Sequence, residues 1–322
     1  MADSDASPSA SLADFSVPEG ASPLTVKPEN RPAGPLPARF FPLGEINDGY
    51  TVPEHLLNPA ELAKIEPPKS VRTFRDRLGD DLSGAERQKY VQFRDIVTEH
   101  GWDKEAGIDE WTTLRFLIAR QFDLKKATKM LEAHVKWREE YKPEERVCPG
   151  CKEDKNNHMM HFCGWDKLYR PVLYLSYAHA GERQNPDWAV AHNVMTFRQA
   201  LSEMPEGVEQ WVAVTDFVSY SHWRDGRSSV GKVVIDIMQA HYPERLGMQI
   251  LVDPPTAFWL LWKCLTPFID AKTKSKVQFM YTTQEPNIHT EFPKIFPPSV
   301  AEWLIRSYEK NKEDFAAKQG KK

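Results

Sequence analysis

The 322-residue sequence contains no uninterrupted apolar run of about 18 residues or more, the minimum for a helix that crosses a bilayer. Its first residues, MADSDASPSASLADF, lack the positively charged start and apolar centre of a secretory signal peptide. Cysteine is also scarce, with only Cys148, Cys151, Cys163 and Cys264. In a reducing cytosol such cysteines are free thiols or metal ligands. We therefore expect a soluble, cytoplasmic protein.

An excess of positive charge is missing as well. The chain has 42 Lys and Arg residues against 46 Asp and Glu residues, which argues against a nucleic-acid-binding protein attracted by overall charge. The G-x-S-x-G, H-E-x-x-H and dinucleotide-binding glycine motifs are absent. GRSSVGKV (226–233) has P-loop spacing, but Val233 stands where a Ser or Thr should bind magnesium. We therefore expect no catalytic residues and no enzymatic activity.

Proline is concentrated at the start of the chain, where twelve of the 25 prolines lie within the first 68 residues. Proline removes a backbone donor and interrupts helices and sheets. We therefore expect residues 1–70 to form a proline-rich, largely disordered leader. Recruitment of a protein partner is one role open to it.

Helical periodicity begins after the leader. GAERQKYVQFRDIVTEHG (84–101) predicts a helix that ends at Gly101, and EWTTLRFLIARQF (110–122) predicts a second one. Asp123 is a suitable N-cap for a third helix, LKKATKMLEAHVKWREEY (124–141). Residues 84–145 are thus predicted to form a small helical subdomain.

The second half of the chain alternates between two kinds of segment. Short runs rich in Val, Ile and aromatic residues predict strands, and amphipathic segments between them predict helices. This alternation is typical of an α/β fold with a mainly parallel sheet flanked by helices, here over residues 146–300, with a C-terminal helix and basic tail at 301–322. The predicted strands are RPVLYLSY (170–177), QWVAVTDF (210–217), GMQILVD (247–253) and KVQFMY (276–281).

The segment CPGCKEDKNNHMMHFC (148–163) is rich in residues that bind metals. Cys148 and Cys151 have the spacing of a zinc knuckle, and His158, His161 and Cys163 follow closely enough to complete a tetrahedral site, with Cys148, Cys151, His158 and Cys163 as the expected set. The alternatives are a solvent-exposed polar loop and a C-x-x-C redox pair, although this pair follows a helix instead of opening one. A structural zinc is one hypothesis here, and we expect no cofactor to be required.

One predicted helix, TAFWLLWKCLTPFI (256–269), is apolar on nearly every face, so it lies deep in a core or covers something apolar. Polar segments flank it: HYPERLG (241–247) precedes the strand before it, and DAKTKSKVQF (270–279) follows it. Phosphate binds cations and hydroxyl donors, and a polyol donates to a carboxylate. These segments therefore contain groups suited to a phospholipid head; the alternative is a pair of solvated turns.

In order along the chain, these segments resemble the CRAL-TRIO lipid-binding domain, and most of all the Sec-fourteen-like phosphatidylinositol transfer proteins. The resemblance covers roughly residues 84–290 and includes LRFLIARQFDLKKATKMLEAHVKWREEY, DKLYRPVLYL, VTDF, HYPERLG, VDPPTAFWLLWKCLTPFID and KTKSKVQF. It implies an α/β fold that encloses an apolar lipid pocket closed by a gating helix at 255–269. It also implies a lipid head-group site formed by Arg120, Glu244, Thr273 and Lys276. The gating-helix and pocket residues that it implies are Phe258, Trp259, Leu261, Trp262, Leu265 and Phe268.

The sequence departs from the family pattern before Asp216, where Trp211 and Ala213 replace small hydroxyl residues that contact choline lipids. The resemblance therefore implies binding and intermembrane transfer of phosphatidylinositol, with little transfer of phosphatidylcholine. A carrier of a sterol-like or isoprenoid ligand is one alternative, and a lipid-regulated scaffold that uses the leader is another. The expected partners are phosphatidylinositol and membrane surfaces, contacted transiently by a monomer that binds no nucleic acid.

Overall fold

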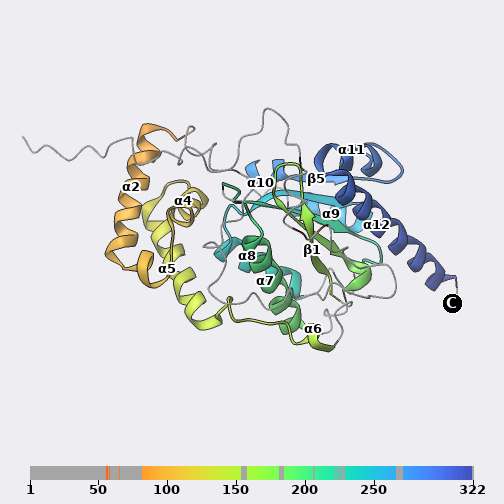
Figure 1. Ribbon diagram of the computed structural model, residues 1–322, viewed down its shortest axis with the longest axis horizontal. Helices are drawn as coiled ribbons and strands as arrows, with labels where there is room; N and C mark the ends of the chain where they lie inside the picture. The colour runs from red at the N-terminus through yellow and green to blue at the C-terminus, as the bar shows by residue number, and fades with distance from the viewer. Residues whose placement is uncertain are drawn as a thin grey trace, which may run out of the picture.

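The computed structural model describes residues 56, 58, 65, 82–153, 158–180, 185–205, 207–221, 223, 225, 229–265 and 271–320 (Figure 1). For residues 152, 153, 229, 260, 261, 264, 265 and 271–273, only the backbone is described. Apart from Leu56, Asn58 and Ile65, the predicted leader lies outside the described residues. Among the described helices, none combines the length and the apolar composition that a membrane span requires.

A helical unit lies beside the sheet, at the left of Figure 1. It consists of α2 (Gly84–Glu99), α3 (Trp102–Glu105), α4 (Glu110–Ala119) and α5 (Leu124–Tyr141). A capping box starts α2, in which Ser83 Oγ accepts from Glu86 N and the Glu86 carboxylate accepts from Ser83 N. The predicted N-cap of α5 is confirmed, because the Asp123 carboxylate accepts from Lys126 N at 3.0 Å. The unit has its own apolar core, which includes Phe93, Phe116, Leu117, Ala127 and Leu131.

Five strands form one sheet in the order β1-β2-β3-β4-β5. They are β1 (Met160–Trp165), β2 (Pro171–Ser176), β3 (Trp211–Asp216), β4 (Leu246–Val252) and β5 (Val277–Met280). β1 is antiparallel to β2, and the other neighbours are parallel. The helices between the parallel strands are α7 (Pro186–Ser202), α8 (Ser229–His241), α9 (Thr256–Leu265) and α10 (Ala271–Lys276). The predicted α/β fold with a mainly parallel sheet is confirmed.

Some elements have no counterpart among the predictions: β1, α3, α6 (Gly150–Glu153), α10 and α11 (Ile288–Ile295). Strand β1 has the sequence MHFCGW and is buried along its whole length. A short apolar run of this kind is typical of a buried strand, but its His and Cys residues led to its interpretation as part of a metal-binding loop. α11 contains Pro293 within it, and proline is a signal against a helix interior.

One face of the sheet is covered by α11 and α12 (Pro298–Gln319) and is tightly closed. The strand residues Val172, Val214 and Ile250 on this face are 0% exposed. α12 contributes buried residues that include Trp303 and Leu304. Because α12 begins at Pro298, the predicted boundary between residues 300 and 301 falls inside a helix that belongs to this core.

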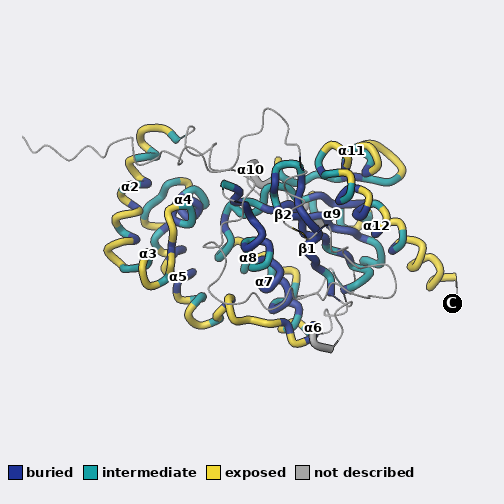
Figure 2. Tube along the Cα trace, viewed as in Figure 1, coloured by how far each residue is buried: buried dark blue, intermediate teal, exposed yellow. Residues whose placement is uncertain are grey.

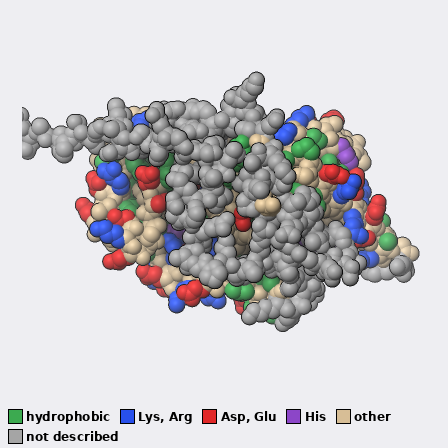
Figure 3. All heavy atoms as spheres, viewed as in Figure 1, with side chains coloured by type: hydrophobic (Ala, Val, Ile, Leu, Met, Phe, Trp, Pro, Cys, Tyr) green, Lys and Arg blue, Asp and Glu red, His purple; other side chains and the backbone are tan. Residues whose placement is uncertain are grey.

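The opposite face is covered near β1 and β2 by α7, which contributes Phe197 and Ala200, and by α8, which contributes Val234 and Met238. Figure 2 shows buried residues concentrated in the strands and α7, and exposed residues on the outer side of the helical unit and the end of α12. Acidic and basic side chains are interspersed over the helical unit in Figure 3, in keeping with the balanced composition of the chain.

Candidate functional site

Glu244 and Lys276, 32 residues apart in sequence, lie together: Lys276 Nζ is 3.5 Å from Glu244 Oε2. Glu244 precedes β4, and Lys276 ends α10 directly before β5. Because β4 and β5 are parallel neighbours, the residues that enter them meet at one edge of the sheet. The two side chains are only 13% and 14% exposed, so their charges interact more strongly than they would in bulk water.

The turn that carries Glu244 is held against the start of β3. Glu244 has a φ of 60°, which is uncommon for a residue other than glycine. Its carbonyl accepts from Gln210 Nε2 at 3.1 Å, and the Arg245 carbonyl accepts from Trp211 N at 2.8 Å. Gly247 permits this close approach, because a Cβ there would lie 3.2 Å from Trp211 O. The position of Glu244 is thus determined by its backbone neighbours.

The other two predicted head-group residues, Arg120 and Thr273, are not seen in contact with this pair. Thr273 lies on α10, ahead of Lys276, and only its backbone is described. Arg120 is the C-cap of α4, and its Nη1 donates to the Ala119 carbonyl at 3.0 Å. Within the described residues, no hydrogen bond or ion pair joins Arg120 to Glu244 or Lys276. Two of the four predicted residues are therefore seen in contact with each other.

Three of the predicted gating-helix side chains are described, and all three face aromatic rings outside α9. Phe258 lies 4.6 Å from Phe217, measured between ring centroids. Trp259 and Trp262 lie 6.4 and 5.8 Å from Phe279 of β5. α9 is therefore in contact with the sheet domain through aromatic side chains.

The remaining members of the predicted set are not described in this detail. Leu261 and Leu265 belong to α9, and their side chains are not described. Phe268 and the last part of the predicted helix 255–269 lie outside the described residues.

The sheet face near α9 is only partly buried among its described residues. Successive side chains of a strand point to opposite faces, so Val277 and Phe279 share one face and Met280 points to the other, where it packs in the α12 core. Val277, Phe279 and Gln249 on the face near α9 are half-buried, whereas Leu251 beside them is 5% exposed. Two apolar side chains, Val277 and Phe279, thus keep part of their surface exposed beside α9.

Arg245, the next residue of the same turn, connects the sheet to the helical unit. Its guanidinium lies 2.6 Å from Glu209 Oε2, and Arg115 of α4 pairs with the same oxygen. The side chains of Arg115, Glu209 and Arg245 are 4%, 6% and 15% exposed. This Arg115–Glu209–Arg245 cluster is a buried ion-pair network that sequence reasoning missed, because its members are far apart along the chain.

His241 and Tyr242 extend this contact to α5. The His241 ring stacks on Trp137, with centroids 4.0 Å apart and an interplanar angle of 7°, and Tyr242 meets Trp137 edge-on. His134 of α5 lies 5.5 Å from His241. Burial lowers the pKa of His241 to about 4, so this ring is neutral at physiological pH. The HYPERLG stretch therefore joins the helical unit through His241, Tyr242 and Arg245, while Glu244 meets Lys276.

The free energy of unfolding is expected to fall as the pH is lowered, because His134 is buried in its neutral form. Burial, together with His241, Arg138 and Arg115, lowers its pKa to about 3. The unfolded chain, with a histidine pKa of about 6.5, then takes up the proton first, so stability is complete above this pH and falls below it. Between pH 7 and pH 5 this residue should remove about 2 kcal/mol from the free energy of unfolding. Urea unfolding at both pH values checks this: His134→Phe should show a smaller loss, and an equal loss would contradict it.

Asp216 stands at the end of β3, where acids of α/β active sites often lie. Its Oδ2 accepts from Tyr174 Oη, Ser176 Oγ and Asn311 Nδ2 at 2.8, 3.0 and 2.8 Å. The side chain is fully buried, and this burial raises the pKa of the carboxyl. Asp216 thus connects β2 and β3 to α12 as a structural residue.

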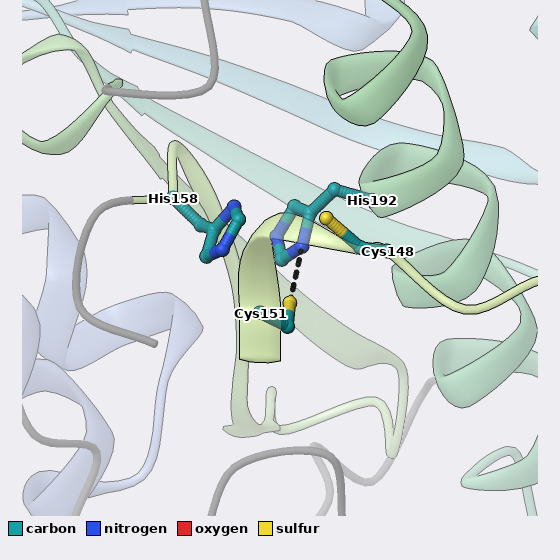
Figure 4. Close-up of side chains that lie close together, drawn as sticks. All are labelled: Cys148, Cys151, His158 and His192. Carbon is teal, nitrogen blue, oxygen red and sulfur yellow. Dashed lines mark hydrogen bonds between the residues drawn. The ribbon is translucent and has the colours of Figure 1, made fainter. Parts of the chain in front are cut away.

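A second group of reactive side chains converges from α6, α7 and the segments beside them (Figure 4). It comprises Cys148, Cys151, His158 and His192, whose potential ligand atoms all lie within 4.8 Å of one another. Cys151 Sγ is 3.4 Å from His192 Nδ1. Hydrogen bonding to Cys151 and then to His192 lowers the pKa of the Cys148 thiol, which favours the thiolate. Two cysteines and two histidines are a ligand set typical of zinc.

The prediction that Cys163 is the fourth ligand is wrong, and His192 takes that place. Cys163 lies on β1, where Met160 and Phe162 pack in the core on the α7 side and Cys163 packs in the core under α12. Side chains alternate along a strand, so Cys163 points away from α7. Its Sγ donates to the Val172 carbonyl at 3.5 Å, and burial raises the pKa of the thiol.

Comparison with known proteins supports the same fold. The profile described as "CRAL/TRIO, N-terminal domain" matches residues 87–133 and the one described as "CRAL/TRIO domain" matches residues 155–300, together more than half of the chain. The chain is 31% identical over 197 residues to CRAL-TRIO domain-containing protein C23B6.04c of Schizosaccharomyces pombe, covering 59% of this chain and 19% of that protein. It is 27% identical over 248 residues to phosphatidylinositol transfer protein PDR17 of Saccharomyces cerevisiae, covering 70% of this chain and 67% of that protein.

Among solved structures, the crystal structure of Sfh5 has a TM-score of 0.51 and 21% identity, covering 62% of this chain and 81% of that chain, which is a likeness of fold. The chain spans only 19% of the fission-yeast relative, so the likeness concerns one domain of that protein. The helical unit, the sheet that follows it and the two matched domains show that this chain belongs to the CRAL-TRIO family of lipid-binding domains.

Proposed function

We propose that this protein binds phosphatidylinositol and transfers it between membranes. The observation that carries the proposal is the Glu244–Lys276 pair, which stands at one edge of a sheet whose face near α9 is incompletely buried. The pair receives the polar head of the lipid. The half-buried side chains of β4, β5 and α9 receive the acyl chains.

The chemistry of the pair suits an inositol phosphate. The Lys276 ammonium donates to phosphate oxygens, and the Glu244 carboxylate accepts from inositol hydroxyls. Their separation of 3.5 Å exceeds the roughly 2.7–2.9 Å of a tight charge-assisted hydrogen bond. A ligand that offers both an anion and hydroxyl donors can therefore replace this loose contact with two better ones. By resemblance to the family, Arg120 and Thr273 supply further donors to the phosphate.

The acyl chains provide most of the binding energy. Each buried CH₂ group contributes about 0.8 kcal/mol, so two chains offset the loss of the membrane environment during transit. α9 faces Phe217 through Phe258 and Phe279 through Trp259 and Trp262, and these aromatic side chains of α9 are half-buried. In the proposed cycle α9 moves away at a membrane surface, the lipid exchanges, and α9 returns over the sheet.

The proposed selectivity for an inositol lipid over a choline lipid follows from β3. Trp211 is fully buried and stacks on Phe197 at 5.2 Å with an interplanar angle of 2°. Ala213 has no hydroxyl group to donate. The name of the Saccharomyces cerevisiae relative, a phosphatidylinositol transfer protein, also favours this lipid.

The first test is to identify, by mass spectrometry, the lipids that co-purify with the 322-residue chain. We expect phosphatidylinositol to be enriched over its share of the host membranes. The purified protein should then move labelled phosphatidylinositol between vesicles at a rate that exceeds its rate with phosphatidylcholine. Recovery of a sterol or isoprenoid, with no transfer of phosphatidylinositol, would overturn the proposal.

A further inference from the structure

We propose that Cys148, Cys151, His158 and His192 bind one structural zinc ion. Zinc in structural sites takes four sulfur or nitrogen ligands at about 2.3 and 2.0–2.1 Å in tetrahedral geometry, which places neighbouring ligand atoms roughly 3.3–3.8 Å apart. Cys151 Sγ and His192 Nδ1 are already 3.4 Å apart. The four ligand atoms lie within 4.8 Å of one another, so small side-chain rotations bring them onto one ion.

Burial distinguishes a structural site from a catalytic one. The exposed fractions of Cys148, Cys151, His158 and His192 are 0%, 6%, 2% and 0%. A catalytic zinc keeps one coordination position for water or substrate, whereas a structural zinc is closed by four protein ligands. Four buried protein ligands therefore indicate a closed site, and the cluster is independent of the lipid-binding residues.

The surroundings of the cluster orient its ligands. His192 Nε2 lies 2.7 Å from the Met160 carbonyl, so this nitrogen carries the proton and Nδ1 is left to face the cysteines. A backbone carbonyl that fixes the second nitrogen of a histidine is a frequent feature of zinc sites. The His158 and His192 rings lie side by side with centroids 4.2 Å apart. His161 supports this arrangement through its contact with the His158 carbonyl at 2.8 Å.

The backbone of the C-P-G-C turn (148–151) also brings its two cysteines close to the histidines. Cys151 N donates to the Cys148 carbonyl at 3.3 Å, which brings the two sulfur atoms to one side of a tight turn. A Cβ at Gly150 would lie 2.8 Å from the Trp188 ring and 3.2 Å from His158 Cε1. Only glycine therefore lets the turn approach His158 and α7 so closely.

The position of the site gives it a role in the fold. The segment that carries Cys148 and Cys151 leaves the helical unit after α5, His158 stands just before β1, and His192 lies on α7. One ion bound by all four residues would join this connection to the helix that covers the sheet. The site would thus stabilise the junction between the helical unit and the sheet.

The test is metal analysis of the 322-residue chain, purified under reducing conditions and then incubated with zinc. We expect one zinc per chain, and the loss of this zinc in Cys151→Ala and in His192→Ala. Cys163→Ala is the matched control, because it removes a buried thiol that points away from α7, and it should keep its zinc. Wild-type protein that holds no zinc would overturn the proposal, as would loss of zinc in Cys163→Ala but not in His192→Ala.

Two further measurements do not require the variants to fold. Cobalt(II) bound to the wild-type chain should give the intense visible bands of a tetrahedral thiolate site, and zinc should abolish them. Removing zinc with a chelator should lower the melting temperature by about 5–10 °C. An octahedral cobalt spectrum, or a melting temperature that the chelator does not change, would contradict a structural site.

Discussion

Replacing Glu209 with alanine should lower the free energy of unfolding by about 3–5 kcal/mol. The Glu209 carboxylate is 6% exposed and pairs with both Arg115 and Arg245, whose side chains are 4% and 15% exposed. Removing it takes away the carboxylate that both buried guanidinium groups share. Loss of one partner of a buried ion pair costs far more than the modest net stabilisation that the pair itself contributes.

Urea unfolding at neutral pH, compared with the wild-type chain, measures this loss. Glu140→Ala is the control, because Glu140 pairs with Lys136 on α5 at 3.8 Å and both side chains are exposed. Its loss should be no more than about 0.5 kcal/mol. Glu209→Gln keeps a hydrogen-bond acceptor and should lie between the two. A loss below about 1 kcal/mol in Glu209→Ala would show that the two arginines find solvent or other partners.

The same cluster links stability to the candidate lipid site. Arg245 follows Glu244 directly in sequence, and its guanidinium connects the turn to Glu209 and to α4. We therefore expect that movement of Arg245 would also shift Glu244, its neighbour in the chain. In this way the helical unit, which lies beside the sheet, helps to fix one half of the proposed head-group site.

The sequence predicted most of the fold because its elements are defined by local signals. Asp123 marks the start of α5 as an N-cap, and the apolar period of 124–141 matches the helix observed. The approach of Glu244 to Lys276 was implied by the resemblance to a family, and no local pattern indicated it. The sequence did not predict the contacts of Arg245 and His241. Arg245 shares Glu209, which precedes β3, with Arg115 of α4, and His241 stacks on Trp137 of α5, so all these partners are distant in the chain.

The Cys148–Cys151–His158–His192 cluster illustrates the limit of spacing as a signal. Cys148, Cys151 and His158 were found from their closeness in the chain, but the fourth member, His192, lies 41 residues beyond Cys151. The available signal was His192 itself, a polar residue within the buried side of α7. Cys163 cannot take this place, because side chains alternate along β1 and that of Cys163 points into the core under α12.

The second large expected effect is a loss of lipid transfer when Lys276 is replaced. Lys276→Ala should reduce the rate of phosphatidylinositol transfer about tenfold or more, because a hydrogen bond between charged groups contributes about 1.5–3 kcal/mol. Glu244→Ala should reduce it by a similar factor, since it removes the acceptor for the inositol hydroxyls. The measurement is transfer of labelled lipid between vesicles, with far-ultraviolet circular dichroism to verify that each variant is folded.

The design separates a binding role from a structural one. Lys310→Ala removes an exposed lysine that pairs with Asp314 on α12, and it should transfer phosphatidylinositol at the wild-type rate. If the Glu244–Lys276 pair only stabilised the turn, each variant would lose stability together with transfer. Direct binding instead predicts that each variant loses phosphatidylinositol transfer while its free energy of unfolding stays close to that of the wild-type chain. Undiminished transfer by both variants, while the wild-type chain is active, would place the head group elsewhere and leave the transfer function standing.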